Sequence, residues 1–243
     1  MRLFGLIGYP LSHSFSKKYF TEKFEQEEIT ECRYDLFPIK TIDELPLLVR
    51  NNPKLEGLNI TIPYKKQVLS FLDASNIPDG LNACNCINIT DGKLVGYNTD
   101  VTGFEKSLKP LLKSYHKNAL VLGNGGATAA VIFVLEKLGI SFEIVSRKLH
   151  DGAVLTYKNI NKKMMTENTL IINTTPLGMY PDTATCPDIP YESISNKHLL
   201  YDLVYNPDKT LFLQKGEERG ARIKNGEEML ILQAEESWRI WNS

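Results

Sequence analysis

Lys65 and Asp100 are the residues of this chain whose side chains are best suited to acid–base chemistry as a pair. Lys65 ends the run Gly-Leu-Asn-Ile-Thr-Ile-Pro-Tyr-Lys at residues 57–65, and Asp100 ends Tyr-Asn-Thr-Asp at residues 97–100. An amine beside a carboxylate can pass a proton to or from a hydroxyl. The other half of the chain carries a glycine-rich turn suited to a dinucleotide, which could exchange a hydride with the same carbon. Together these features predict an alcohol dehydrogenase that needs no metal.

The bulk composition excludes several classes of protein. The chain has 243 residues, of which 42% are hydrophobic, enough for one large domain or two small ones. Its 28 Lys+Arg against 29 Asp+Glu give a net charge of -1 and no electrostatic footprint for nucleic acid or an anionic membrane. The apolar runs fall far short of a bilayer span, and the N-terminus lacks a signal-peptide layout. We therefore expect a cytoplasmic protein.

The cysteines and histidines do not predict a metal site. Cys84 and Cys86 form a lone Cys-x-Cys without a second pair at zinc-ribbon spacing. The remaining candidates show no His-x-x-x-His pair; they are Cys32, Cys186, His13, His116, His150 and His198. We expect reduced, buried thiols and no metal.

Strand and helix patterns alternate along the chain, which favours an α/β fold with parallel strands. In the first half we expect strands at 3–8, 34–39, 58–63, 86–89 and 93–97, and helices at 17–26, 41–51 and 65–72. Thr41 and Glu44 have the spacing of a capping box. Asp91-Gly92 between two strand patterns predicts a hairpin. The domain junction is expected after Asp100.

The second half reads as a nucleotide-binding layout. Expected strands cover 119–122, 142–145, 170–173 and 199–204, and expected helices cover 101–113, 128–138 and 227–241. Gly139 lies where a glycine helix stop belongs. The first strand–helix–strand unit has the size of a mononucleotide-binding half.

The glycine turn, with Gly123, Asn124, Gly125, Gly126 and Ala127, follows a strand and opens a helix. Gly123 permits the tight turn, and Gly125 lets a pyrophosphate approach the backbone at the positive end of the helix. Thr128 replaces the third glycine of the usual fingerprint. An ordinary tight turn is the alternative interpretation.

The three residues that follow the expected strand 142–145 indicate which dinucleotide is bound. An NAD site uses Asp or Glu there for the ribose hydroxyls, but this chain has Ser146, Arg147 and Lys148. Arg147 could hold a 2′-phosphate with help from Ser146 or Lys148. This favours NADP; a solvated pair of loop cations is the alternative.

Polar residues gather on loops of the first half. Ser14 and Ser16 are two apart, so in an extended loop both hydroxyls would face one side and suit a carboxylate or polyol. Thr61, Lys65, Asn85 and Asp100 lie on strand connections, where α/β proteins place ligands. Loop capping and turn chemistry by the serines, and a solvated surface lysine, are the alternatives.

Taken together, these blocks resemble those of the shikimate dehydrogenases. The ordered matches are residues 8–16 with Gly-x-Pro-x-x-His-Ser-x-Ser, 57–65 with Gly-x-Asn-x-Thr-x-Pro-x-Lys, 83–86, 96–100 with Gly-x-Asn-Thr-Asp, 123–127 with Gly-x-Gly-Gly-Ala, 172–179, 201–207 and 226–234. They span nearly the whole chain. The resemblance implies an N-terminal α/β substrate domain (1–100), a Rossmann-like NADP-binding domain (101–225) and a C-terminal helix (226–243) that returns to the substrate domain.

The resemblance also implies roles for the matched positions. Lys65 and Asp100 would be catalytic. Shikimate would be held by Ser14, Ser16, Thr61, Asn85, Tyr205 and Gln233. The NADP site would be formed by Gly123, Asn124, Gly125, Gly126, Ala127, Ser146, Arg147, Lys148, Leu203 and Gly226. The implied reaction is the reversible NADPH-dependent reduction of 3-dehydroshikimate to shikimate in chorismate and aromatic amino-acid biosynthesis, by a monomer or homodimer.

Some positions depart from the family pattern. Lys17 stands where Pro is usual, Asn82 where Gly is usual, and Ala129 where many members have Arg. The segment 148–170 is short, so a full helix after the second Rossmann strand is in question. These changes concern cofactor affinity more than the chemistry.

Three other functions remain open at this point. They are a quinate or dual-specificity dehydrogenase, a non-catalytic NADP sensor of the same fold, and a methylene-tetrahydrofolate dehydrogenase. A sensor would be expected to lose Lys65 or Asp100. The Ser14/Ser16 block and the block 226–234 argue against the folate enzyme.

Overall fold

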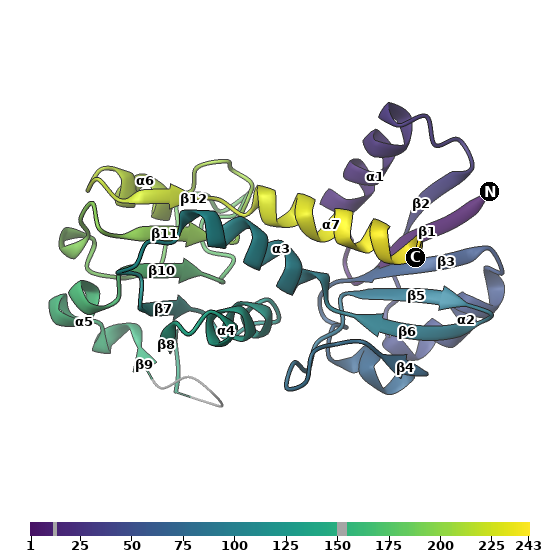
Figure 1. The fold of residues 1–243 in the computed structure, drawn as a ribbon, viewed down its shortest axis with the longest axis horizontal. Coiled ribbons are helices and arrows are strands. Elements are labelled where there is room, and N and C mark those ends of the chain that lie inside the picture. Colours follow the sequence, from purple (N-terminus) through teal and green to yellow (C-terminus); the bar gives the residue numbers. More distant parts are fainter. Residues whose placement is uncertain (12–13, 150–154) are drawn as a thin grey trace. The chain divides into compact units, whose positions relative to one another are not determined.

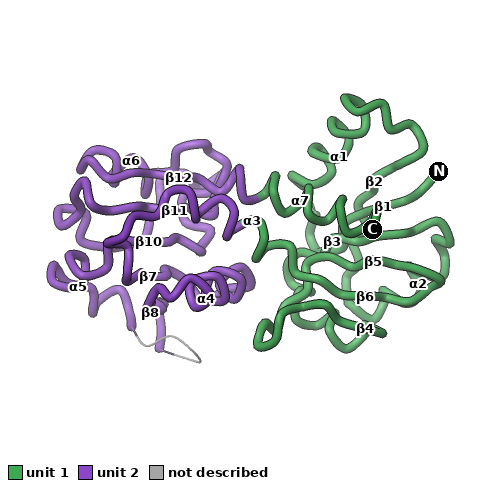
Figure 2. The backbone as a smooth tube through the Cα atoms, viewed as in Figure 1, with its two compact units in different colours: residues 1–103, 230–243 green, residues 104–229 purple. Residues whose placement is uncertain are grey.

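The computed structural model describes residues 1–11, 14–149 and 155–243, and it divides into two compact units. Unit 1 comprises residues 1–103 and 230–243, and unit 2 comprises residues 104–229 (Figure 2). The chain passes between the units within helix α3 (Thr99–Leu108) and again within helix α7 (Glu227–Trp241). The end of the chain therefore belongs to the same unit as its beginning.

Unit 1 is built on a six-stranded mixed sheet with the order β2-β1-β3-β5-β6-β4 (Figure 1). Its strands are β1 (Arg2–Ile7), β2 (Cys32–Phe37), β3 (Leu55–Ile60), β4 (Ala74–Ser75), β5 (Cys86–Thr90) and β6 (Lys93–Tyr97). Strands β2, β1 and β3 are parallel, whereas β3, β5 and β6 are antiparallel neighbours. The hairpin predicted between β5 and β6 is confirmed: Asp91 and Gly92 have φ of 51° and 75°, as a tight primed turn requires.

Both faces of this sheet are covered. Alternate residues of β1 point to opposite faces. Leu3 and Ile7 join one core cluster with the segment that carries α2 (Leu45–Asn51), and Phe4 joins a second cluster with α1 (Phe15–Gln26) and α7. In the second cluster, Trp241 stacks on Phe4 with ring centroids 4.8 Å apart and donates its indole N–H to the Ile87 carbonyl at 3.0 Å. The C-terminal helix is thus an integral layer of unit 1.

Unit 2 is built on a six-stranded sheet with the order β12-β11-β10-β7-β8-β9. Its strands are β7 (Asn118–Leu122), β8 (Ser141–Ser146), β9 (Leu155–Thr156), β10 (Leu170–Asn173), β11 (Leu199–Asp202) and β12 (Arg222–Lys224). All neighbouring pairs are parallel. In chain order this is the 3-2-1-4-5-6 arrangement of a Rossmann fold, which reverses direction between β7 and β10.

Helices cover the sheet of unit 2 (Figure 1). They are α4 (Thr128–Lys137), α5 (Lys162–Glu167), α6 (Leu211–Glu217) and the later part of α3. The short α6 packs Phe212 and Leu213 into the core that includes Leu120 and Leu200. Gly139 follows α4 with φ of 66°, which confirms the predicted glycine stop.

Several predicted elements differ in the structure. The segment 65–72 forms a 3-10 helix at Gln67–Phe71 rather than an α-helix. The Lys65 carbonyl accepts a hydrogen bond from the Cys84 N–H at 2.7 Å, so this segment is tied to the neighbouring loop. The helix expected at 101–113 ends at Leu108 and continues as a 3-10 turn. Sequence analysis did not predict β4, β9, α5, α6 or β12.

The described part of the short segment 148–170 contains little helix. It forms β9, a 3-10 turn at Tyr157–Asn159 and the six-residue α5. Residues 150–154 lie outside the described ranges, as do Ser12 and His13 of the first matched block.

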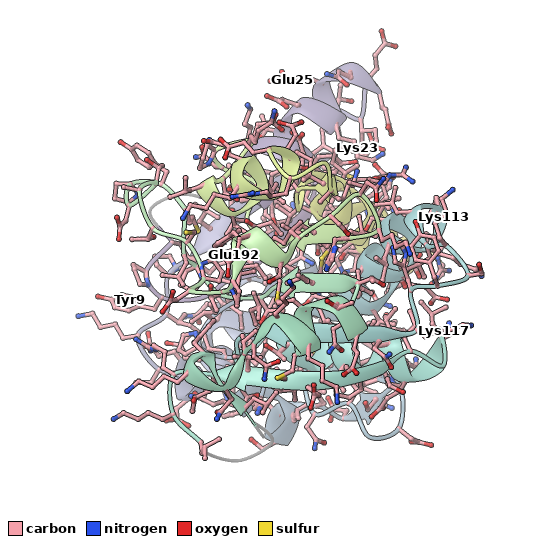
Figure 3. All side chains as sticks on the ribbon, turned by 90° about the vertical axis from the view of Figure 1, so that its left-hand side faces the viewer. Tyr9, Lys23, Glu25, Lys113, Lys117 and Glu192 are labelled. Carbon is pink, nitrogen blue, oxygen red and sulfur yellow. The ribbon has the colours of Figure 1, made fainter. Side chains whose placement is uncertain are left out.

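The structure shows the surroundings of the four cysteines and of the histidine His116. All four cysteines are free, and all but Cys186 are buried. Lys113 and Lys117 are exposed (Figure 3), whereas His116 is buried, and its ring accepts the Lys113 N–H at 3.0 Å. Burial lowers its pKa. Within the described residues, no His, Cys, Asp and Glu side chains cluster as metal ligands, and no helix is long and apolar enough to cross a membrane.

Candidate active site

One edge of the unit 1 sheet brings three motifs together. Asn59 on β3 is level with Cys86 on β5, and Cys86 is level with Tyr97 on β6. The carboxyl ends of β3 and β6 and the amino end of β5 therefore lie side by side. The segments that carry Lys65, Asn85 and Asp100 all adjoin this edge, although the sequence separates Lys65 from the other two.

The structure pairs Lys65 with Asp100. The Lys65 Nζ lies 2.6 Å from Asp100 Oδ2, and the side chains are only 17% and 10% exposed. Asp100 is in the first turn of α3, where the helix dipole favours a negative charge. Asn98 accepts the Val101 N–H at 3.2 Å and so caps this helix. The ammonium is thus held in a fixed place with little access to water.

Asn85 orients the carboxylate of that pair. Its Nδ2 donates to Asp100 Oδ1 at 2.9 Å and to Thr99 Oγ1 at 3.0 Å, and its Oδ1 accepts the Thr99 N–H at 2.6 Å. The Thr99 hydroxyl lies 3.4 Å from Gln233 Oε1 on α7. The structure therefore connects four of the predicted residues, Lys65, Asp100, Asn85 and Gln233, through Thr99.

The network continues through residues that sequence analysis did not assign. The Ser237 Oγ lies 3.2 Å from Thr99 Oγ1 and accepts Asn59 Nδ2 at 2.9 Å. The Asn59 Oδ1 accepts the Tyr34 hydroxyl at 2.8 Å. Asn59 and Thr99 lie within the matched motifs, and Ser237 is one helical turn after Gln233, a spacing that places both on one face of α7.

The two serines of the first block do not lie in an extended loop, so the condition under which both hydroxyls would face one side is not met. Helix α1 begins at Phe15, and Ser14 caps it by accepting the Lys17 N–H at 3.2 Å. Ser16 lies in the first turn of the same helix, near the Tyr34 hydroxyl. Thr61 is half-buried directly after β3, where its N–H donates to the Ile7 carbonyl at 3.0 Å.

The glycine turn of unit 2 has open space above its backbone. Gly123 has φ of 116°, and a Cβ there would lie 2.6 Å from Thr174 Oγ1, so this position requires glycine. At Gly125 and Gly126 a Cβ would meet no atom within 4 Å. No side chain caps α4 at Ala127, which leaves the helix N-terminus suited to an anion. Thr128, in place of the third glycine, accepts the Gly125 N–H at 3.0 Å.

A hollow of about 340 Å³ lies at the point where the sheet reverses direction, which is where α/β folds bind ligands. Its lining comes from the ends of the four strands β7, β8, β9 and β10 and comprises Gly123, Asn124, Gly125, Ser146, Arg147, Tyr157, Thr174, Thr175, Pro176 and Leu177. Ser146 is buried, whereas Arg147 and Lys148 are exposed. Arg147 forms no ion pair with any of the described residues, so its charge is available to a 2′-phosphate.

The residues after β11 and β12 lie close together. A Cβ on Gly226 would lie 2.2 Å from the Leu203 carbonyl oxygen, and the Gly226 N–H donates to the Val204 carbonyl at 3.1 Å. Only glycine allows this approach. Tyr205 is half-buried, and burial raises its pKa. Sequence analysis assigned no cofactor role to residues 174–177, although they belong to the matched block 172–179.

Fold and site define a two-unit α/β protein with a Rossmann-type sheet in one unit and a Lys–Asp pair in the other. Residues 6–87 match the family described as shikimate dehydrogenase substrate binding domain. The shikimate dehydrogenase (NADP(+)) of Clostridium beijerinckii is 38% identical over 255 residues, covering 99% of this chain and 92% of the relative. This chain belongs to the shikimate dehydrogenase family.

Two further relatives extend the comparison. The shikimate dehydrogenase (NADP(+)) of Methanococcus maripaludis is 35% identical over 257 residues, covering 99% of this chain and 91% of the relative. Shikimate 5-dehydrogenase of Thermus thermophilus, solved in complex with NADP(H) and shikimate, superimposes with a TM-score of 0.85 at 28% identity. That match covers 99% of this chain and 93% of the other.

Proposed function

We propose that this protein is an NADP-dependent shikimate dehydrogenase that reversibly reduces 3-dehydroshikimate to shikimate. The observation that carries the proposal is the shielded Lys65–Asp100 ion pair, held at 2.6 Å in a chain that also has an open glycine turn on a Rossmann-type sheet. The named relatives act on shikimate with NADP(+).

Lys65 acts as the proton donor in the reduction. Bound NADPH supplies the hydride for the carbonyl carbon. Negative charge then grows on the carbonyl oxygen, and the Lys65 ammonium gives that oxygen a proton; in the oxidation its amine takes the proton back. Asp100 holds the lysine side chain in place, and Asn85 holds Asp100. A positioned proton donor typically contributes about 10²–10⁴-fold to the rate.

In this proposal, the substrate's carboxylate and ring hydroxyls are bound by Ser14, Ser16, Thr61, Asn85, Tyr205 and Gln233. Polar side chains that hydrogen-bond a substrate discriminate strongly, because a ligand that lacks a hydroxyl leaves some of them without partners. The cofactor is bound by Gly123 to Ala127, Ser146, Arg147, Lys148, Leu203 and Gly226. The open backbone at Gly125 and Gly126 and the available Arg147 charge fit a pyrophosphate and a 2′-phosphate.

The test is reduced-nicotinamide absorbance at 340 nm with shikimate or quinate and with NADP⁺ or NAD⁺. We expect turnover with shikimate and NADP⁺. Lys65→Ala should lower kcat by about 10²–10⁴-fold, because the proton donor is lost, while NADP⁺ binding persists. Lys66→Ala is the matched control, since Lys66 is an exposed neighbouring cation, and it should retain full activity.

Other outcomes decide among the alternatives. Preferred turnover of quinate would make the protein a quinate dehydrogenase. NADP⁺ binding without turnover of either acid would identify a non-catalytic sensor. Near-normal kcat in Lys65→Ala would remove Lys65 from the mechanism.

A further inference from the structure

A second hollow adjoins the one at the glycine turn. It measures about 480 Å³ and is lined by Arg147, Thr156, Tyr157, Lys158, Leu177, Cys186 and Asp188. Arg147, Tyr157 and Leu177 line both hollows. The shared residues make the two hollows successive parts of one path that begins at the glycine turn.

Arg147 and Tyr157 are neighbours because of strand register. Strands β8 and β9 are parallel, with Ser146 level with Thr156. Arg147 and Tyr157 directly follow the two strands, so both stand at the carboxyl edge of the sheet. Ligands of α/β proteins bind at that edge. Tyr157 is therefore placed where a ligand that passes Arg147 would arrive.

The Tyr157 ring, rather than its hydroxyl, faces the path. Its hydroxyl is buried and has no hydrogen-bond partner among the described residues. Burial raises the pKa of this group to about 12, while the nearby Arg147 charge acts to lower it. The ring packs at the edge of the unit 2 core and lines both hollows. What it can offer a ligand is a flat aromatic surface beside a guanidinium.

We propose that the adenine of NADP lies against the ring of Tyr157 and extends from Arg147 into the second hollow. This inference rests on the proposed function. A base stacks favourably on an aromatic ring, and Arg147 can serve both the 2′-phosphate and the edge of the base. Tyr157 thus strengthens binding of the adenosine half, whereas Arg147 selects for the phosphate.

The test measures dissociation constants by calorimetry for NADP⁺ and for 2′,5′-ADP, which has the adenosine half without nicotinamide. Tyr157→Ala should weaken both ligands by the same factor of about 10 or more, the size of a lost base–aromatic stack. Tyr157→Phe should bind like the wild type, because it keeps the ring. Leu155→Ala is the packing control, because Leu155 packs against the same core but is not among the residues that line either hollow. This substitution should leave both dissociation constants unchanged.

Two results would overturn the assignment of Tyr157. One is a Tyr157→Ala protein that binds both ligands within twofold of wild type. The other is a loss confined to NADP⁺, which would place the nicotinamide half, not adenine, at this ring. Failure of the wild type to bind either ligand would instead refute the proposed function.

Cys186 provides a second readout without any substitution. It lines the second hollow and is the partly exposed thiol of the chain, the other three being buried. Saturating NADP⁺ or 2′,5′-ADP should slow its alkylation by a thiol reagent by about tenfold, and nicotinamide mononucleotide should not. Equal rates with and without NADP⁺ would exclude the second hollow from the binding path.

Discussion

Asp202 is a buried carboxyl that the proposed chemistry does not use. It is fully buried at the end of β11, where it accepts Thr210 Oγ1 at 2.6 Å, Asn173 Nδ2 at 2.9 Å and the Val204 N–H at 3.0 Å. These bonds join β10, β11 and the start of α6. Burial raises the pKa of Asp202 from 3.8 to about 6, although the three hydrogen bonds act to lower it.

The pH dependence of stability should report this carboxyl. Between about pH 4 and 6 the folded state holds the proton and the unfolded state does not, so the contribution to stability is present below pH 4 and is lost as pH rises through 6. The free energy of unfolding of the wild type minus that of Asp202→Asn should be larger at pH 4.5 than at pH 7.5 by roughly 1–3 kcal/mol. Urea unfolding at both pH values measures it. A difference that is constant, or that grows with pH, would contradict the raised pKa.

At the scale of elements, α7 is attached to the β3 edge through Ser237. Ser237 is fully buried, accepts Asn59 Nδ2 at 2.9 Å and donates to the Gln233 carbonyl at 2.9 Å. Asn59 leads into the loop with Lys65, and Gln233 is on the same helix. One hydroxyl therefore links two segments that carry predicted substrate residues.

Ser237→Ala should loosen this link. Removing the hydroxyl leaves the Asn59 amide poorly paired and should lower the free energy of unfolding by roughly 1–3 kcal/mol. Because Gln233 and Thr99 lose a partner that positions them, KM for shikimate should rise severalfold while the dissociation constant for NADP⁺ stays the same. Ser70→Ala, at an exposed serine, is the control. An unchanged KM would reduce Ser237 to a purely structural role.

At the scale of the whole molecule, unit 1 is completed by the last residues of the chain. A Cβ on Gly57 would lie 2.3 Å from the Trp241 indole nitrogen, so β3 and α7 are closely packed. Trp241 also stacks on Phe4 and bonds Ile87. The loss of such a buried aromatic residue alone costs about 3–5 kcal/mol.

A chain that ends at Met229 should therefore keep unit 2 folded and lose unit 1. Hydrogen exchange should show rapid exchange throughout residues 1–103 and continued protection of β7, β8, β10 and β11. Trp241→Ala in the full chain should give a milder form of the same pattern. Equal protection of both units in the shortened chain would show that α7 is dispensable for unit 1.

Local patterns determined much of the fold in advance. The bounds of α7, the Asp91-Gly92 hairpin, the Gly139 stop and the strand-to-helix turn at Gly123 depend on apolar period and on glycine conformation within a few residues. The segment 65–72 was predicted wrongly because its hydrogen bonding involves a distant loop, through Cys84.

The arrangement of side chains needed the tertiary structure. Lys65, Asn85 and Asp100 meet because β3, β5 and β6 are neighbours in register, and Tyr157 stands beside Arg147 because β9 aligns with β8. Ser237 reaches Asn59 because the last helix packs on the first sheet. Sequence motifs indicated which residues could take part in chemistry, because a motif is defined by residue types and their spacing along the chain. Contacts between residues far apart in the chain depend on strand order and register, which no short window of sequence encodes.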